Sequence, residues 1–247
     1  VRSKVEGGLS SPKWKEAREL TTSDYLGFPI NTESQLLQGY PSLESKFQEL
    51  NFWKLVGVLL AFPFTLKGEE VILKVENKHF GLLSTLTGDL FDTSYRDISA
   101  SQVDFHIRDC ALVNYLRESG LKHRKLRFQA QWVDLPLPHL RALLCGFQSV
   151  SGQMVESTSA LFIVGKELFY GLSQLVLKAY KTPFKVVESE NNHYTITFSE
   201  LETQSDSMIF EGVYVWVSVR SASYTPYKSN VYDISVKDNH SFTVQNC

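Results

Sequence analysis

The chain has 247 residues, of which 43% are hydrophobic and 21% charged, a composition that favours a folded chain with a sizeable core and excludes a disordered one. Its formal net charge of −2 gives no overall basic character that would point to nucleic acid. The longest apolar run, residues 55–64, is interrupted by Gly57 and ended by Pro63. It is too short to cross a bilayer, so we expect no membrane partner.

The three cysteines argue against a disulfide framework or a zinc site, because they are odd in number and far apart. They are Cys110, Cys145 and Cys247. The histidines have no cysteine or histidine neighbour at metal-ligand spacing, and we read His79, His106, His123, His139 and His193 as ordinary core or surface residues. The chain begins at Val1 with no secretory pattern. We expect a piece of a longer protein in the cytoplasm or another reducing compartment.

Both ends of the chain have the pattern of β-structure. Residues 1–31 are short extended segments separated by turn residues, and residues 213–219 alternate valine with other side chains at a period of two. The middle alternates helices and strands. This order predicts an α+β protein in which a β-domain, residues 1–31 and 205–247, is interrupted by an inserted unit, residues 44–200.

The first part of the insert begins with an apolar helix. Asn51 is the expected N-cap of a helix over residues 52–62, which Pro63 ends. A strand pair is expected at residues 64–66 and 71–75, followed by a second helix near residues 80–91.

The second part of the insert repeats this order. Pro136 or Pro138 opens a helix that runs through residues 140–147, strands follow at 154–156 and 160–164, and an amphipathic helix covers residues 166–180. An offset of 89 residues superposes Gly57 on Gly146 and Phe62 on Ser151. Paired glycines indicate two helices whose backbones cross closely. The alternative is two unrelated core helices with one glycine each.

Several segments of the chain resemble motifs of a known family. Residues 14–26, with Trp14 and Asp24-Tyr25-Leu26, resemble the strand-turn-strand of inteins, and residues 231–244 resemble the penultimate intein motif. Residues 52–60 and 140–147 are similar to the two dodecapeptide motifs of the LAGLIDADG homing endonucleases that are inserted in many inteins. Residues 131–133 and 166–168 fit inteins of family B DNA polymerases. The resemblance implies a Hint (splicing) β-domain in two pieces, interrupted by a pseudo-twofold αββα LAGLIDADG-like domain.

The resemblance also locates the nuclease chemistry. In the family, each central helix ends in an acidic residue, and the pair holds the divalent metal ions that activate water. The matching positions here are Phe62 and Ser151, and neither can be an anionic ligand. Asp89 and Glu156 lie nearby in sequence but not where the family uses an acid. We therefore expect endonuclease activity to be lost and no cofactor, since magnesium is expected only for an active endonuclease.

For splicing, the family uses an N-terminal nucleophile and a Thr-x-x-His motif, and neither is present in the opening segment. Asp233 and His240 match positions that support cyclisation of a terminal Asn, His240 as a proton donor or acceptor. Asn246-Cys247 is either the splice junction or the turn before a missing strand. The implied partners are the missing N-terminal intein segment and the host exteins.

Two other functions stay open: a DNA-binding module without cleavage, and a magnesium-dependent endonuclease that is still active. Double-stranded DNA is the partner in both. Residues 44–200 carry 17 Lys and Arg against 17 Asp and Glu, which gives no basic surplus. One cluster, Lys122, Arg124, Lys125 and Arg127, is a phosphate contact or a solvated linker.

Overall fold

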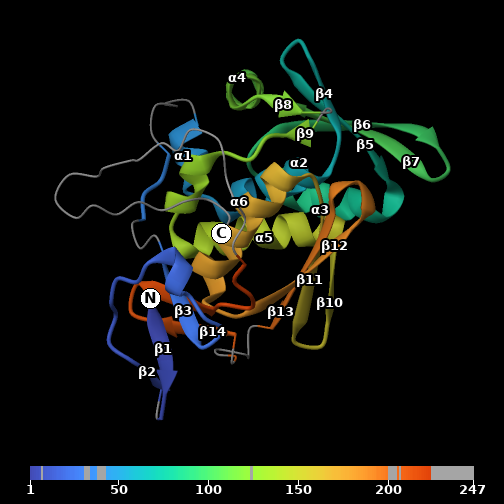
Figure 1. Ribbon diagram of the computed structural model, residues 1–247. Helices are drawn as coiled ribbons and strands as arrows, with labels where there is room; N and C mark the ends of the chain where they lie inside the picture. Colours follow the sequence, from blue (N-terminus) through green and yellow to red (C-terminus); the bar gives the residue numbers. More distant parts are fainter. Residues whose placement is uncertain are drawn as a thin grey trace, which may run out of the picture.

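The computed structural model describes residues 1–6, 8–30, 34–37, 43–122, 125–199, 205 and 207–223. These residues form a β-sheet with strands from residues 2–29 and 208–218, and a central unit in which helices pack with two further large sheets (Figure 1). None of the described helices is long and apolar enough to span a membrane.

Strands from the two chain ends pair within one five-stranded antiparallel sheet in the order β14-β15-β3-β1-β2. Its strands are β1 (Arg2–Val5), β2 (Gly8–Leu9), β3 (Asp24–Pro29), β14 (Met208–Glu211) and β15 (Tyr214–Ser218), with the 3-10 helix η1 (Ala17–Glu19) between β2 and β3. The long-range contact is β3 with β15, in register from Tyr25 opposite Ser218 to Pro29 opposite Tyr214.

Two long apolar helices lie side by side in the middle of the molecule (Figure 1). They are α2 (Leu50–Ala61) and α5 (Leu137–Ser151), and the short helix α1 (Glu44–Phe47) precedes α2. The proline signals act as predicted, since Pro63 follows α2 and α5 begins just after Pro136.

The predicted N-cap at Asn51 is wrong. The N-cap position is Glu49, without a side-chain cap, and Asn51 lies inside the first turn. A tertiary contact decides this boundary, because the Trp53 indole N–H donates to the buried carbonyl of Phe47 at 2.8 Å and fixes the corner between α1 and α2.

The first half of the central unit follows α2. Its elements are β4 (Phe64–Lys67), β5 (Glu70–Glu76), α3 (Asn77–Thr87), β6 (Asp92–Ser99), β7 (Gln102–Arg108) and α4 (Cys110–Ser119), and its sheet has the order β4-β5-β7-β6. Helix α3 begins and ends earlier than the helix predicted near residues 80–91, with Glu76 as its N-cap and Gly88 as its C-cap. The β6–β7 hairpin was not predicted, since β6 is polar and almost wholly exposed.

The second half follows α5 in the same order. Its elements are β10 (Gly152–Val155), β11 (Thr158–Val164), α6 (Lys166–Tyr180), β12 (Phe184–Ser189), η4 (Glu190–Asn192) and β13 (His193–Ser199). Its sheet has the order β10-β11-β13-β12, so both sheets place their strands as first, second, fourth and third. The segment between the halves contains β8 (Leu121–Lys122), β9 (Lys125–Leu126) and the 3-10 helix η3 (Ala130–Asp134).

A continuous core joins the two halves. The inner faces of both four-stranded sheets, the central helices and the flanking helices contribute to one buried cluster. The buried Trp132 indole N–H donates to the Tyr115 hydroxyl at 3.1 Å, which ties η3 to α4. Because the inner faces of the two four-stranded sheets are committed to this core, the central unit exposes its helix ends and its outer sheet faces.

Candidate functional site at the helix pair and the open sheet faces

The two central helices touch through their glycines. A Cβ atom on Gly57 would lie 2.0 Å from the Leu143 carbonyl oxygen, and one on Gly146 would lie 1.9 Å from the Lys54 carbonyl oxygen. Such distances leave no room for any side chain, so backbone meets backbone here. Phe62 and Ser151 each stand five residues beyond the glycine of their own helix.

Phe62 is the C-cap of α2 and packs against a histidine. Its ring lies edge-on to the His79 ring, with 5.4 Å between centroids. Burial, and the nearby Lys78 charge, lower the pKa of His79, so its neutral form is favoured. His79 Nδ1 is buried and has no hydrogen-bond partner within the described part of the chain.

Ser151 is the last residue of α5. Its hydroxyl donates to the Phe162 carbonyl at 2.7 Å, which turns the hydroxyl toward β11. The two helix ends therefore present an aromatic ring and a neutral hydroxyl whose proton is engaged.

These residues do not fit magnesium, which needs a nearly octahedral set of oxygen ligands with carboxylates among them. The acids that are near in sequence do not replace the missing ones. Glu156 lies in the turn after β10, about 13 Å along the strand from the end of α5, and Asp89 follows the C-cap of α3. Across the described residues, no three His, Cys, Asp or Glu side chains are grouped to hold a metal ion.

The sheet of the first half has an open face that carries alternating charges. Across strands β4, β5, β7 and β6, one row consists of Lys67, Glu70, Arg108 and Asp92 in direct register. Opposite charges in neighbouring strands attract one another. This row is therefore compensated within the sheet.

Glu70 is the centre of that row. Its carboxylate accepts a hydrogen bond from Arg108 Nε at 2.6 Å and lies 3.0 Å from His106 Nδ1. The Arg108 bond, followed by the His106 bond, lowers the pKa of Glu70, and Glu70 in turn raises the pKa of Arg108. A phosphate that approached Arg108 would compete with Glu70.

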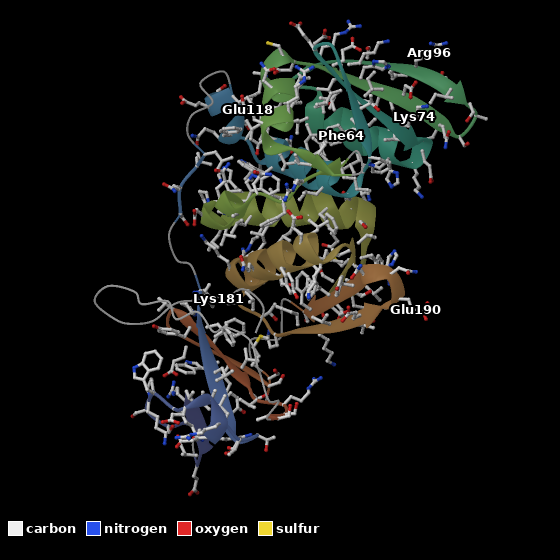
Figure 2. The ribbon with its side chains drawn as sticks, turned by 45° about the horizontal axis from the view of Figure 1, so that its top comes forward. Phe64, Lys74, Arg96, Glu118, Lys181 and Glu190 are labelled. Carbon is white, nitrogen blue, oxygen red and sulfur yellow. The ribbon has the colours of Figure 1, made fainter. Side chains whose placement is uncertain are left out.

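A second row on the same face has a surplus of positive charge. Lys74 on β5 and Arg96 on β6 both stand opposite Asp104 on β7, and Figure 2 shows the two cations on this sheet. Asp104 Oδ1 is buried and without a hydrogen-bond partner among the described residues. The alternation of charged and apolar residues in β5 and β7 is the sequence signal that would have found both rows.

The corresponding face of the second half is almost without charge, and apolar side chains lie on it beside threonines. Phe162 and Val164 on β11 and Val187 on β12 are 44%, 56% and 59% exposed, and they alternate with the buried Leu161, Ile163 and other inward residues. Lys185 is the only charged residue that the register places on this face within the four strands described. This face offers almost no charge to a phosphate backbone.

Two residues of the basic cluster, Lys122 and Lys125, lie opposite each other in a short strand pair. β8 pairs with β9, and Arg127 just beyond forms an ion pair with Glu167 on α6 at 2.7 Å. Burial lowers the pKa of Lys125. His123, Arg124 and the side chain of Lys122 lie outside the described residues.

The predicted splicing residues Asp233, His240, Asn246 and Cys247 lie outside the described residues, so their roles stay predictions. Cys110 and Cys145 are exposed free thiols. Among the other histidines, His139 Nε2 lies 3.2 Å from the Gln48 carbonyl and His193 Nδ1 3.0 Å from the Glu190 carbonyl.

No protein-family model and no curated protein matches this sequence. Solved structures that match part of this chain include the homing endonuclease I-DmoI, at 12% identity and a TM-score of 0.45 over 61% of this chain and 88% of that one. Another is the N-terminal LAGLIDADG domain of WhiA, at 12% identity and a TM-score of 0.41 over 67% and 89%. Full-length WhiA from Thermatoga maritima matches at 10% identity and a TM-score of 0.43, over 62% of this chain and 51% of that one.

The chain's own geometry classifies the central unit: two helices meet at paired glycines, and each leads into a four-stranded sheet of one shared order. The central unit is therefore a pseudo-twofold α+β unit of two related halves.

Proposed function

We propose that this chain is part of an intein-type self-splicing protein and that its inserted LAGLIDADG-like module no longer cleaves DNA. The loss of cleavage is inferred from the two residues at the helix ends, Phe62 and Ser151. Hydrolysis of two phosphodiesters by this fold needs a carboxylate from each helix to hold the metal ions. A phenyl ring and a hydroxyl bonded to the Phe162 carbonyl supply neither.

Two observations support the splicing part of the proposal. The opening and closing segments resemble intein motifs, and strands from the two ends pair as β3 and β15 although the whole LAGLIDADG-like module lies between them in sequence. An insert that leaves its host sheet continuous is compatible with a function of the host. In that function, Asp233 and His240 support cyclisation of a terminal Asn, with Asn246 and Cys247 as the candidate junction.

Splicing is tested by supplying an intein segment with an N-terminal nucleophile as a separate polypeptide. Ligation of the flanking sequences is expected, and His240→Ala should slow C-terminal cleavage by at least about tenfold. His193→Ala, an exposed histidine of the second half, is the matched control. C-terminal cleavage at an unchanged rate in His240→Ala would remove this histidine from the site.

Cleavage is tested with a plasmid library in magnesium. We expect no double-strand breaks, and cleavage that a chelator abolishes would contradict the proposal. The double variant Phe62→Asp, Ser151→Asp should bind Mn²⁺ measurably by calorimetry where the unmodified chain does not, because facing carboxylates supply the main attraction for a hard cation.

A second candidate function is contact with double-stranded DNA through the open face of the first sheet. The row of Lys74, Asp104 and Arg96 favours it, because one of its two cations is uncompensated. Variants of I-DmoI were solved in complex with its target DNA. Loss of salt-dependent DNA binding in Lys74→Ala, Arg96→Ala, with binding kept in Lys185→Ala on the second sheet, would support this function. If Lys74→Ala, Arg96→Ala bound DNA as well as Lys185→Ala does, this function would be excluded.

A further inference from the structure

Strand β6 is the outermost strand of the first four-stranded sheet and pairs there with β7 alone. It has eight residues, and all of them except the half-buried Thr93 are exposed. The other edge strands of the two four-stranded sheets are shorter, since β4 and β10 have four residues and β12 has six. Figure 1 shows the β6–β7 hairpin reaching outward from the body of the molecule. β6 is therefore the longest open edge of these two sheets.

Main-chain bonds at the two ends of β7 show which way its residues face. The Asp109 N–H donates to the Glu69 carbonyl at 3.1 Å, and the Asn77 N–H donates to the Ser101 carbonyl at 3.0 Å. Both bonds continue the pairing of β5 with β7. Because main-chain groups alternate in direction along an antiparallel strand, odd-numbered residues of β7 bond to β5 and even-numbered residues bond to β6.

The same alternation decides which groups of β6 face its open edge. Ser94 stands opposite His106, so the even-numbered residues of β6 bond to β7. The N–H and carbonyl groups of Thr93 and Tyr95 point the other way and have no partner among the described residues. The register with β7 is regular as far as Asp97. This stretch of unpaired groups is a template for another strand.

The outer face of the sheet carries an acid and a base along this edge. The balanced charge row ends on β6 in Asp92, and the row with the extra cation ends in Arg96. The Asp92 side chain is 73% exposed and lies 3.9 Å from Arg108. Figure 2 shows Arg96 at the outer rim of the sheet, away from the central helices. A strand that runs antiparallel to β6 with the same sequence can meet each charge with its opposite.

We propose that two copies of this chain pair edge to edge through β6, antiparallel and about a twofold axis that passes between their Ser94 residues. In this register, Asp92 of each copy stands opposite Arg96 of the partner copy. Thr93 exchanges main-chain hydrogen bonds with Tyr95 of the partner copy, two bonds for each of the two symmetric pairs. The two first sheets then form one continuous sheet. This inference goes beyond the proposed splicing function and does not depend on it.

The charge rows of the two copies join in this register. Arg96, which shares Asp104 with Lys74 in a single copy, gains a second carboxylate as its neighbour. The sign of the charge then changes at every step along the joined row: Lys67, Glu70, Arg108 and Asp92 of one copy, followed by Arg96, Asp104 and Lys74 of the other.

Neighbouring registers of β6 lack this match. A register centred on Arg96 puts two guanidinium groups opposite each other, which is unfavourable, and one centred on Tyr95 puts Arg96 opposite Ser94. The edge of β12 also lacks it. Lys185 and Glu188 are three residues apart and so lie on opposite faces of their sheet, where no antiparallel self-pairing sets one opposite the other.

The first test is the concentration dependence of the molecular mass. The interface has few main-chain bonds and exposed ion pairs, so we expect dimers to form between about 10 µM and about 1 mM chain and to weaken several-fold at high salt. Sedimentation equilibrium measures this, with a reducing agent present because Cys110 and Cys145 are exposed thiols. A chain that is still monomeric at the upper concentration would overturn the proposal.

Charge reversal tests the register. Asp92→Arg and Arg96→Asp should each weaken self-association at least about tenfold, because each places like charges opposite one another. An equimolar mixture of the two variants should associate as tightly as the unmodified chain, since every facing pair is then of opposite sign. Lys185→Asp on β12 is the control and should change nothing. Circular dichroism checks that each variant is folded. A mixture that associates no better than its components would overturn the proposal.

Amide exchange locates the contact independently of charge. On raising the chain concentration, the amides of Thr93 and Tyr95 should become protected at least about tenfold. The amides of Ser94 and Arg96 should change little, because they already bond to β7. Equal gains at all four amides, or gains at β12 in place of β6, would contradict edge pairing through β6.

Discussion

The two halves of the central unit have one topology and two different surfaces. Their sheets share the order first, second, fourth and third strand, and the inward residues of the two middle strands of each sheet are buried almost completely. Their open faces have diverged: the first carries rows of alternating charge, and the second carries Phe162, Val164 and Val187 with little charge. Packing therefore constrains the residue types of the inner faces strongly, whereas solvent or a binding partner constrains those of the outer faces.

The largest effect is expected where both halves depend on the same contact. Gly57→Ala or Gly146→Ala should each lower the free energy of unfolding by about 3 kcal/mol or more, because the added methyl group meets a backbone carbonyl of the other helix. Urea unfolding followed by circular dichroism measures this. The two variants should lose similar free energies of unfolding if the two halves are equivalent at this contact.

The matched control is Gly81→Ala in α3, where a Cβ would meet nothing within 4 Å. It should raise the free energy of unfolding by up to about 1 kcal/mol, because alanine favours a helix over glycine. If Gly57→Ala behaved like this control, the close helix contact would be wrong.

The next prediction compares the apolar surface that the outer faces of the two sheets expose. Phe162→Ser should reduce binding of a dye for apolar surface several-fold, because it removes the largest exposed apolar side chain from the second sheet face. Ile72→Ser on the first sheet, which is only partly exposed between Thr65 and His106, should change dye binding little. Equal losses would show that the two faces are not as different as their residues indicate.

A third effect is a pH dependence confined to the first half. Arg108 and His106 hold the pKa of Glu70 below its ordinary value of 4.5, so the stabilisation is present above that value and is lost as pH falls through the lowered pKa. Amide protection in β5 and β7, corrected for intrinsic exchange, should therefore fall on acidification before protection in β11 and β13. A simultaneous fall in both sheets would contradict this.

The smallest effect concerns DNA. Glu70→Gln removes the carboxylate that occupies Arg108, so affinity for double-stranded DNA should rise a few-fold and its salt dependence should steepen by about one phosphate contact. Glu188→Gln in the second half, whose carboxylate accepts the Tyr194 hydroxyl at 3.1 Å, should leave both unchanged. Filter binding over a series of salt concentrations measures the two variants side by side.

The sequence predicted an element well where its hydrophobic periodicity is strong or where a proline or glycine marks its end. The helix over residues 166–180 has the predicted bounds, and the strands after each central helix lie within two or three residues of those expected. Sequence failed where local signals were weak or overruled. Asn51 resembles an N-cap, yet the Trp53 bond to Phe47 sets the helix start elsewhere, and β6 has too few buried residues to show a strand period.

Sequence alone determined the repeat, its glycines and the absence of carboxylates at Phe62 and Ser151, because helix periodicity, punctuation and residue chemistry are local properties. Only the tertiary structure decided which charges meet on the first sheet and that the second open face is almost without charge. Those properties depend on the register between strands distant in the chain. That register is fixed by packing against the shared core and cannot be read from any one segment.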